Sequence, residues 1–131
     1  MAHFLVDNPE DWIGENKSLQ KRFDSIKALP DGMPKRGSMT HAILYMLVLN
    51  TYMTAPQMAK SRWSYEVGNY NETLRLFGAL GLVERRRRDD EPNVAYWWIT
   101  DAGKKLEKKW REKSGTPGGG KPMVARSTAS A

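Results

Sequence analysis

The 131-residue chain contains no cysteine, which excludes disulfides, thiolate metal sites and cysteine nucleophiles. Its longest apolar run, from Ile43 to Leu49, is far shorter than the ~20 residues needed to cross a bilayer. The opening residues, MAHFLVDNPEDW, lack the basic stretch followed by an apolar one that marks a secretory signal. We therefore expect a cytoplasmic protein without a membrane partner, either associated with the nucleoid or acting in an infected host cell.

Residues typical of catalysis are also scarce. Histidine occurs only as His3, near the terminus, and His41, at the start of an apolar segment. The sequence shows no phosphate-binding glycine loop, metal-ligand spacing or nucleophile motif. The acidic run from Asp89 to Glu91 could bind a cation, but a hairpin turn explains it better. We expect no enzymatic activity, no catalytic residues, no cofactor and no bound metal.

Basic residues are in excess, and the formal net charge is +6. Residues 1–37 hold six basic and six acidic side chains, whereas residues 38–113 hold 13 basic and nine acidic ones. The last residues add Lys121 and Arg126. The excess therefore falls outside the first segment, as expected for a protein whose partner carries phosphates. Charge alone is weak evidence, because many basic proteins bind no nucleic acid.

Residues 1–37 are predicted to form an N-terminal extension with one short amphipathic helix. Leu19, Phe23 and Ile26 recur at helical spacing, and Pro30 lies beyond the predicted end of the helix. Together with Trp12, these apolar side chains are our candidates for a homodimer contact.

Residues 38–113 are predicted to form one domain, which begins with two helices. The first is capped by Ser38 or Thr40, runs to about Thr51, and is apolar on nearly all sides, which is typical of a buried central helix. Tyr52-Met53 leaves room for one strand-like step. Thr54 then caps a short second helix, which is predicted to end near Arg62 or Trp63.

A third helix, two strands and a last helix complete the predicted domain. The third helix is capped by Asn69 or Asn71 and ends at Gly81. The remaining predicted elements are strand Leu82–Arg87, the turn Asp89–Asn93, strand Val94–Ile99, and a helix capped by Thr100 that runs to about Lys113. Residues 114–131 are rich in Gly, Ser, Thr and Ala without periodicity, which predicts a flexible tail.

This order resembles a winged helix-turn-helix domain of the MarR and PadR type. The resemblance rests on Gly81-Leu82-Val83-Glu84-Arg85 at the end of the third helix and on Ile99-Thr100-Asp101-Ala102-Gly103-Lys104 after the two strands. It covers roughly residues 38–113 and implies a mainly α fold with a small β-hairpin, in the order helix, strand, helix, helix, strand, strand, helix. Two features differ from these families: the loop before the third helix is longer, and Glu72 stands where they often place a serine or arginine facing DNA.

The third helix is the candidate recognition helix. Asparagine can bond adenine at two points, and arginine can do the same to guanine or bind phosphate. One asparagine can cap the helix while the other contacts DNA. The candidate DNA-binding side chains in and before this helix are Lys60, Arg62, Asn69, Tyr70, Asn71, Thr73 and Arg75.

The arginine run from Arg85 to Arg88 lies on the first arm of the predicted hairpin. Because side chains alternate along a strand, Arg85 and Arg87 should face one way and Arg86 and Arg88 the other. One pair is then free to reach phosphates, unless the neighbouring acidic residues neutralise the run. Since those acidic residues form the tip, we expect contacts from the strand and not from the tip.

The aromatic run Tyr96-Trp97-Trp98 on the second strand has two interpretations. Alternation sends Trp97 to one face and the other two rings to the opposite face. Exposed rings can stack on single-stranded bases or form a protein interface. Packing across the hairpin and onto the helices is the simpler interpretation.

Together these features predict a small transcriptional regulator that binds double-stranded DNA as a homodimer. The third helix would enter the major groove and the wing arginines would contact phosphates. Two alternatives stay open. One is a winged-helix module that binds a protein partner, as in a phage or mobile-element protein that redirects host machinery. The other is an architectural or single-strand binder that uses Trp97 or Trp98.

Overall fold

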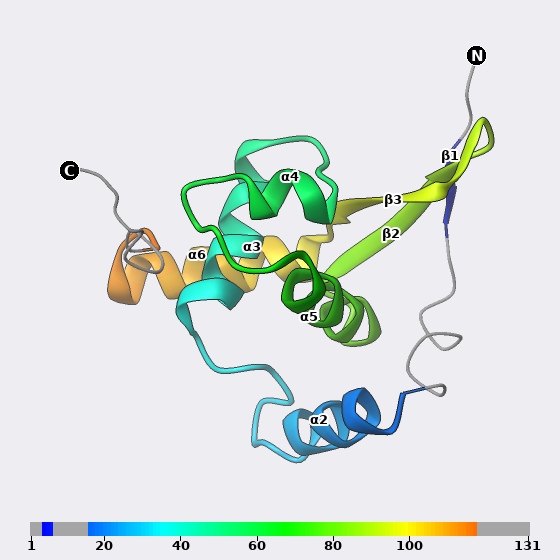
Figure 1. Cartoon of the computed structure of the whole chain (residues 1–131). Coiled ribbons are helices and arrows are strands. Elements are labelled where there is room, and N and C mark those ends of the chain that lie inside the picture. The colour runs from blue at the N-terminus through cyan, green and yellow to red at the C-terminus, as the bar shows by residue number, and fades with distance from the viewer. Residues whose placement is uncertain (1–3, 7–15, 118–131) are drawn as a thin grey trace.

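The computed structural model describes residues 4–6 and 16–117. In these residues the chain forms a mixed α/β fold of five helices and one three-stranded antiparallel sheet (Figure 1). Helices α4, α5 and α6 gather around α3, α2 lies on the far side of α5, and β2 and β3 extend away from the helices as a ribbon (Figure 1). In chain order the elements are β1 (Phe4–Val6), α2 (Lys17–Lys27), α3 (Ser38–Leu49), α4 (Ala55–Ala59), α5 (Val67–Ala79), β2 (Val83–Arg88), β3 (Glu91–Ile99) and α6 (Asp101–Ser114).

Helix α3 is the central helix, as its composition predicts. Ile43, Leu44 and Leu47 are buried in one apolar core with side chains from α4, α5, both strands of the ribbon and α6. Neither predicted cap, Ser38 or Thr40, occupies the N-cap. That position is Gly37, whose N–H donates to the hydroxyl of Thr40. No helix within the described ranges is both long and apolar enough to cross a membrane.

The short helix α4 follows a single bridge between Met53 and Trp97 of β3, which confirms the strand-like step predicted there. Thr54 caps α4 by accepting from the N–H of Gln57, and the side chain of Gln57 accepts in return from the N–H of Thr54. The helix is shorter than predicted and ends at Ala59. Its start is therefore fixed by a local capping box.

Helix α5 begins earlier than predicted. Its N-cap is Glu66, so Asn69 and Asn71 lie inside the helix and neither caps it. At the other end Gly81 takes a φ of 79°, and the N–H of Leu82 donates to the carbonyl of Phe77. This left-handed glycine ends the helix, as predicted, and turns the chain into β2.

The sheet has the order β1-β2-β3, with both pairs antiparallel. The hairpin of β2 and β3 was predicted, whereas β1, which pairs with Arg86 to Arg88, was not. The connecting turn is also tighter than predicted, since β3 already begins at Glu91. A register shift lies between Arg87 and Arg88, next to this turn.

Helix α6 is joined to the end of α5 through Thr100. Its hydroxyl accepts from the N–H of Gly103 and donates to the carbonyl of Gly81, which confirms the predicted cap. A side chain at Gly103 would collide with the carbonyl of Leu82, so this close approach requires glycine. The two sequence segments that carry the family resemblance are therefore in contact.

The helix predicted within the first 37 residues is α2, which packs against α5. Leu19 is fully buried against Leu76, and Phe23 and Ile26 are partly buried beside them. Leu19 thus contributes to the interior of its own chain, which removes it from the predicted dimer contact. Trp12 and the tail beyond residue 117 lie outside the described residues.

Candidate nucleic-acid interface

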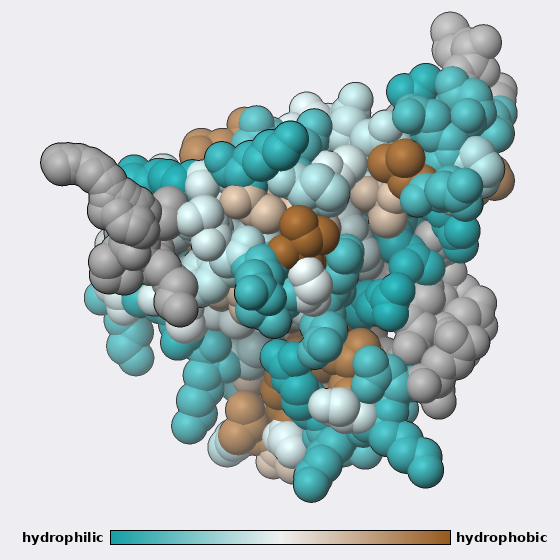
Figure 2. Space-filling model, viewed as in Figure 1, coloured by the Kyte–Doolittle hydropathy of each residue, from teal (hydrophilic) through white to brown (hydrophobic). Residues whose placement is uncertain are grey.

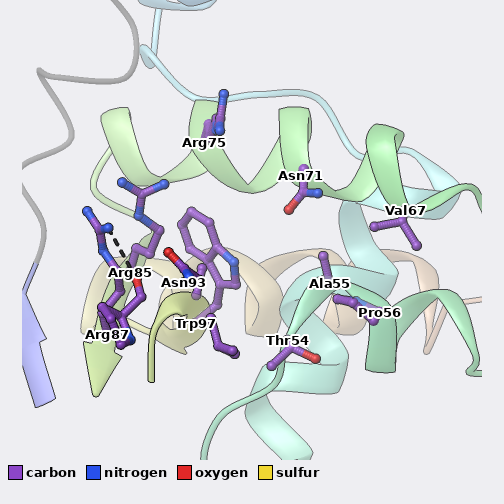
Figure 3. Close-up of a pocket in the computed structure, with 13 residues that line it drawn as sticks. Thr54, Ala55, Pro56, Val67, Asn71, Arg75, Arg85, Arg87, Asn93 and Trp97 are labelled. Carbon is purple, nitrogen blue, oxygen red and sulfur yellow. Dashed lines mark hydrogen bonds between the residues drawn. The ribbon is translucent and has the colours of Figure 1, made fainter. Parts of the chain in front are cut away.

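An open groove of about 620 Å³ separates α5 and the start of α4 from the ribbon of β2 and β3. We call it the α5–ribbon groove (Figure 3). Polar and cationic side chains enter it from both sides: Asn71 and Arg75 from α5, Arg85 and Arg87 from β2. The remaining lining residues are Thr54, Ala55, Pro56, Val67, Pro92, Asn93, Val94, Ala95 and Trp97.

Helical spacing explains which side chains α5 presents to the groove. Val67, Asn71 and Arg75 recur every four residues and are exposed, whereas Leu74 and Phe77 belong to the buried core. Figure 3 shows Asn71 directed from α5 toward the space above α4. The helix therefore offers one amide and one guanidinium along a single stripe.

Strand alternation divides the four arginines as predicted. Arg85 and Arg87 line the groove, and the guanidinium of Arg85 lies 5.8 Å from the ring centre of Trp97 (Figure 3). The Nη1 of Arg87 donates to the carbonyl of Pro92 over 3.4 Å. Trp97 itself is only 1% exposed, so it serves as a fixed wall for the Arg85 side chain.

The other two arginines pair with carboxylates. Arg86 contacts Glu84 at 2.6 Å, and Arg88 contacts Asp90 at 2.8 Å and Glu91 at 3.1 Å. The hydrogen bond to Asp90 raises the pKa of the Arg88 guanidinium. Carboxylates therefore neutralise Arg86 and Arg88. Two of the acidic side chains at the tip are held by Arg88.

The aromatic run divides in the same way. Tyr96 and Trp98 lie on the face opposite Trp97, where each forms a ring contact with Tyr52. Arg86 covers the Trp98 ring at 4.4 Å. This confirms the predicted alternation and favours packing across the hairpin for these rings. Because Trp97 is buried, it cannot stack on a single-stranded base.

Glu72, the residue that departs from the family pattern, forms an ion pair with Arg22 of α2 at 3.6 Å. It lies on α5 one position beyond Asn71 and is exposed, but it does not line the groove. The carboxylate is thus partly balanced by a cation from the N-terminal segment.

Several candidate residues are placed elsewhere. Tyr70 is fully buried, its hydroxyl donates to the carbonyl of Trp63, and burial raises its pKa to about 12. Thr73 is 1% exposed. Both were wrong as contact residues, because they lie on the face of α5 that packs on the core. Asn69 is exposed but does not line the groove.

Lys60 and Arg62 lie in the segment that follows α4. Both are exposed and neither lines the groove, and the guanidinium of Arg62 lies 5.2 Å from the ring centre of Trp63. The sequence interpretation missed two groups of groove residues instead. These are Thr54 to Pro56 at the start of α4, where the sequence indicated only a cap at Thr54, and Pro92 to Ala95 on β3.

Searches against protein-family models, curated proteins and solved structures found no match for this chain. In the part of the chain that the structure describes, no group of three or more His, Asp or Glu side chains could hold a metal ion.

Proposed function

We propose that the chain binds double-stranded DNA through the α5–ribbon groove and acts as a small transcriptional regulator. The element order supports a winged helix-turn-helix interpretation: α3, α4 and α5 form the helical part, and β2 and β3 form the wing. The single bridge at Met53 supplies the short strand before α4. In this layout α5 is the recognition helix, as the MarR and PadR resemblance implies.

One observation carries the proposal. Asn71 and Arg75 of α5 and Arg85 and Arg87 of β2 line the same concave surface, although they come from two elements. Asparagine and arginine are the side chains that most often read adenine and guanine in the major groove. Arginines on the adjacent wing suit phosphates, which fix the position of the recognition helix.

The proposed DNA-binding set is accordingly narrower than the sequence predicted. It comprises Asn71 and Arg75 for base edges, and Arg85 and Arg87 for the backbone. A homodimer remains part of the proposal, because two half-sites raise specificity. Since Leu19 is buried within its own chain, it is not available for the dimer contact.

The direct test is a fluorescence-anisotropy titration of the full chain with labelled duplex DNA at two salt concentrations. Two or more phosphate contacts predict that a rise from about 50 to about 200 mM salt lowers the association constant at least about tenfold. An absence of binding, or binding that does not respond to salt, would contradict the proposal. Single-stranded DNA of the same sequence should bind more weakly.

A second candidate function, protein binding, rests on the opposite face of the sheet. Leu49 is 63% exposed and Tyr52 41% exposed at the end of α3, near Trp98. Such a patch suits a protein interface. Recovery of one stoichiometric protein partner, with no shift of duplex DNA, would favour this function over DNA binding.

A further inference from the structure

A second hollow, of about 500 Å³, lies between residues 29–36 and the C-terminal half of α6. We call it the α6 hollow. The C-terminal end of α6 and the wing lie at opposite ends of the molecule (Figure 1), so the hollow is separate from the α5–ribbon groove. Its lining combines the apolar side chains of Leu29, Met33, Pro34 and Trp110 with the cationic side chains of Lys35, Arg36, Lys109 and Lys113.

The charge of the α6 hollow is strongly one-sided. Four cations line it, and Asp31 is the one carboxylate among the lining residues. Figure 2 shows hydrophilic side chains covering much of the molecular surface, with apolar ones in small separate areas. Cations gathered around an apolar floor repel one another unless an anion lies between them.

Arg36 is held in place by a buried network. Its Nε donates to Nδ1 of His41 over 2.8 Å, and Nε2 of His41 lies 3.0 Å from Oε2 of Glu107. Both side chains of this histidine–glutamate pair are 0% exposed. Glu107 also accepts from Nε of Arg111, at the surface of α6.

The protonation state of the network follows from its donors. Arginine keeps its protons, so Nδ1 of His41 has to accept from Arg36, and Nε2 carries the hydrogen that is donated to Glu107. Burial lowers the pKa of His41, which agrees with a neutral ring. The network uses only one of the five N–H donors of Arg36, and its other donors can serve a ligand at the hollow.

Burying the carboxylate of Glu107 beside a neutral ring carries a desolvation cost, so the network is weak evidence for stability by itself. The hydrogen bond from Arg36 to His41 instead fixes the orientation of the Arg36 guanidinium at the wall of the α6 hollow. Preorganised cations lower the entropic cost of binding an anion. The apolar floor also favours a ligand with an apolar part, which inorganic anions and a phosphate backbone lack.

We propose that the α6 hollow binds a small organic anion: an apolar body that packs on Trp110 and Met33, with one acidic group bound by Arg36 and the rim lysines. The inference is independent of DNA binding. It assigns the buried His41–Glu107 pair a positioning role for Arg36.

The probe for this site is 8-anilinonaphthalene-1-sulfonate, which has an aromatic body and one sulfonate. Binding to the full chain is measured by its fluorescence and by shifts of backbone amide resonances around Met33 and Trp110. The double variant K109E/K113E reverses two rim charges and should weaken binding at least about tenfold, or about 1.4 kcal/mol. The matched control K104E/K105E reverses two exposed charges on the same helix and should bind as the wild type does.

Three results would overturn the proposal. They are equal losses in the two charge-reversed variants, displacement of the probe by inorganic phosphate alone, and loss of binding in R85A/R87A, which would place the probe in the α5–ribbon groove. The variant R36M tests the proposal a second time, by removing the guanidinium of the exposed Arg36. It should lose probe affinity while its far-UV circular dichroism stays that of a folded chain. Its urea midpoint should fall as well, because the buried Nδ1 of His41 loses its donor. Unchanged probe affinity in folded R36M would contradict the role of Arg36.

The positioning role has its own readout. H41Q removes the ring that holds Nε of Arg36, and it should weaken probe binding less than R36M does. In the R36M background, H41Q should cause no further loss of probe affinity, because the two side chains then act as one unit. Equal additional losses in both backgrounds would reject the positioning role.

Discussion

The two faces of the β2–β3 ribbon carry the same residue types in very different surroundings. On the groove face, Arg85 lies beside the buried ring of Trp97, and Arg87 lines the same groove with Asn71 of α5. On the outer face, Arg86 pairs with a carboxylate and covers Trp98, which remains partly exposed. The comparison teaches that a run of like charges has no single role, because a strand sends alternate residues to different neighbours.

The largest expected difference between the faces concerns the two tryptophans. Replacing Trp97 by alanine should cost about 3–5 kcal/mol of unfolding free energy, because it leaves a cavity in the core. Trp98 to alanine should cost less than half of this amount, since the ring is only partly buried. Urea denaturation of both variants followed by far-UV circular dichroism measures the two costs. Similar losses would show that the faces are equally packed.

The second comparison concerns DNA affinity. The variant R85A/R87A should bind duplex DNA at least about tenfold more weakly, a loss of about 1.4 kcal/mol or more, and its salt slope should fall by about two. The matched control R86A/R88A removes the same charge from the outer face and should lose about threefold or less. Anisotropy titrations at one salt concentration rank the two variants. If the control loses as much affinity as the groove variant, net charge and not the groove determines binding.

The helix side of the groove offers a test in which stability and affinity should change in opposite directions. Gly68 is exposed, and a Cβ built on it meets nothing within 4 Å. It lies on the outer face of α5 with Asn71 and Arg75, at helical spacing. No internal contact therefore requires glycine, whereas a closely approaching partner would.

Replacing Gly68 by alanine should stabilise the chain by about 0.5–1 kcal/mol, because glycine is a poor helix former. The same change should lower the affinity for duplex DNA severalfold. N69A, in the same turn but not on the stripe of Gly68, Asn71 and Arg75, serves as the control and should leave DNA affinity nearly unchanged. A G68A variant with higher stability and unchanged affinity would show that no partner approaches the helix this closely.

Local features of the fold were predictable from sequence, and long-range ones were not. The caps at Thr54 and Thr100 and the glycine end of α5 were found because their partners lie within a few residues. Strand β1 was missed, since three residues near the start of the chain pair with a strand 80 to 84 positions later. The His41–Glu107 pair spans 66 positions and leaves no local pattern.

The candidate site shows the same limit. Alternation predicted that the arginines would separate into two pairs, but the pairing of Arg85 with Trp97 across the strands decides which pair faces α5. Tyr70 and Thr73 were wrongly assigned to the contact surface although they share the core-facing side of α5 with Leu74. Which residues of a helix are exposed depends on which side of the helix faces the core. The composition of the first turn does not show which side that is.

The smallest expected effect is the strength of the ion pair between Arg86 and Glu84, which tests how firmly that carboxylate holds an arginine of the outer face. The pair measures 2.6 Å but both side chains remain about one-third exposed, at 34% and 33%. Exposed pairs of this kind contribute about 0.2–1 kcal/mol, because water screens them and two side chains are ordered. A double-mutant cycle with R86A, E84A and the double variant should give a coupling energy within this range. A larger value would mean that Arg86 is firmly held by its carboxylate, whereas a value near zero would leave Arg86 available to a phosphate and weaken the distinction between the two faces.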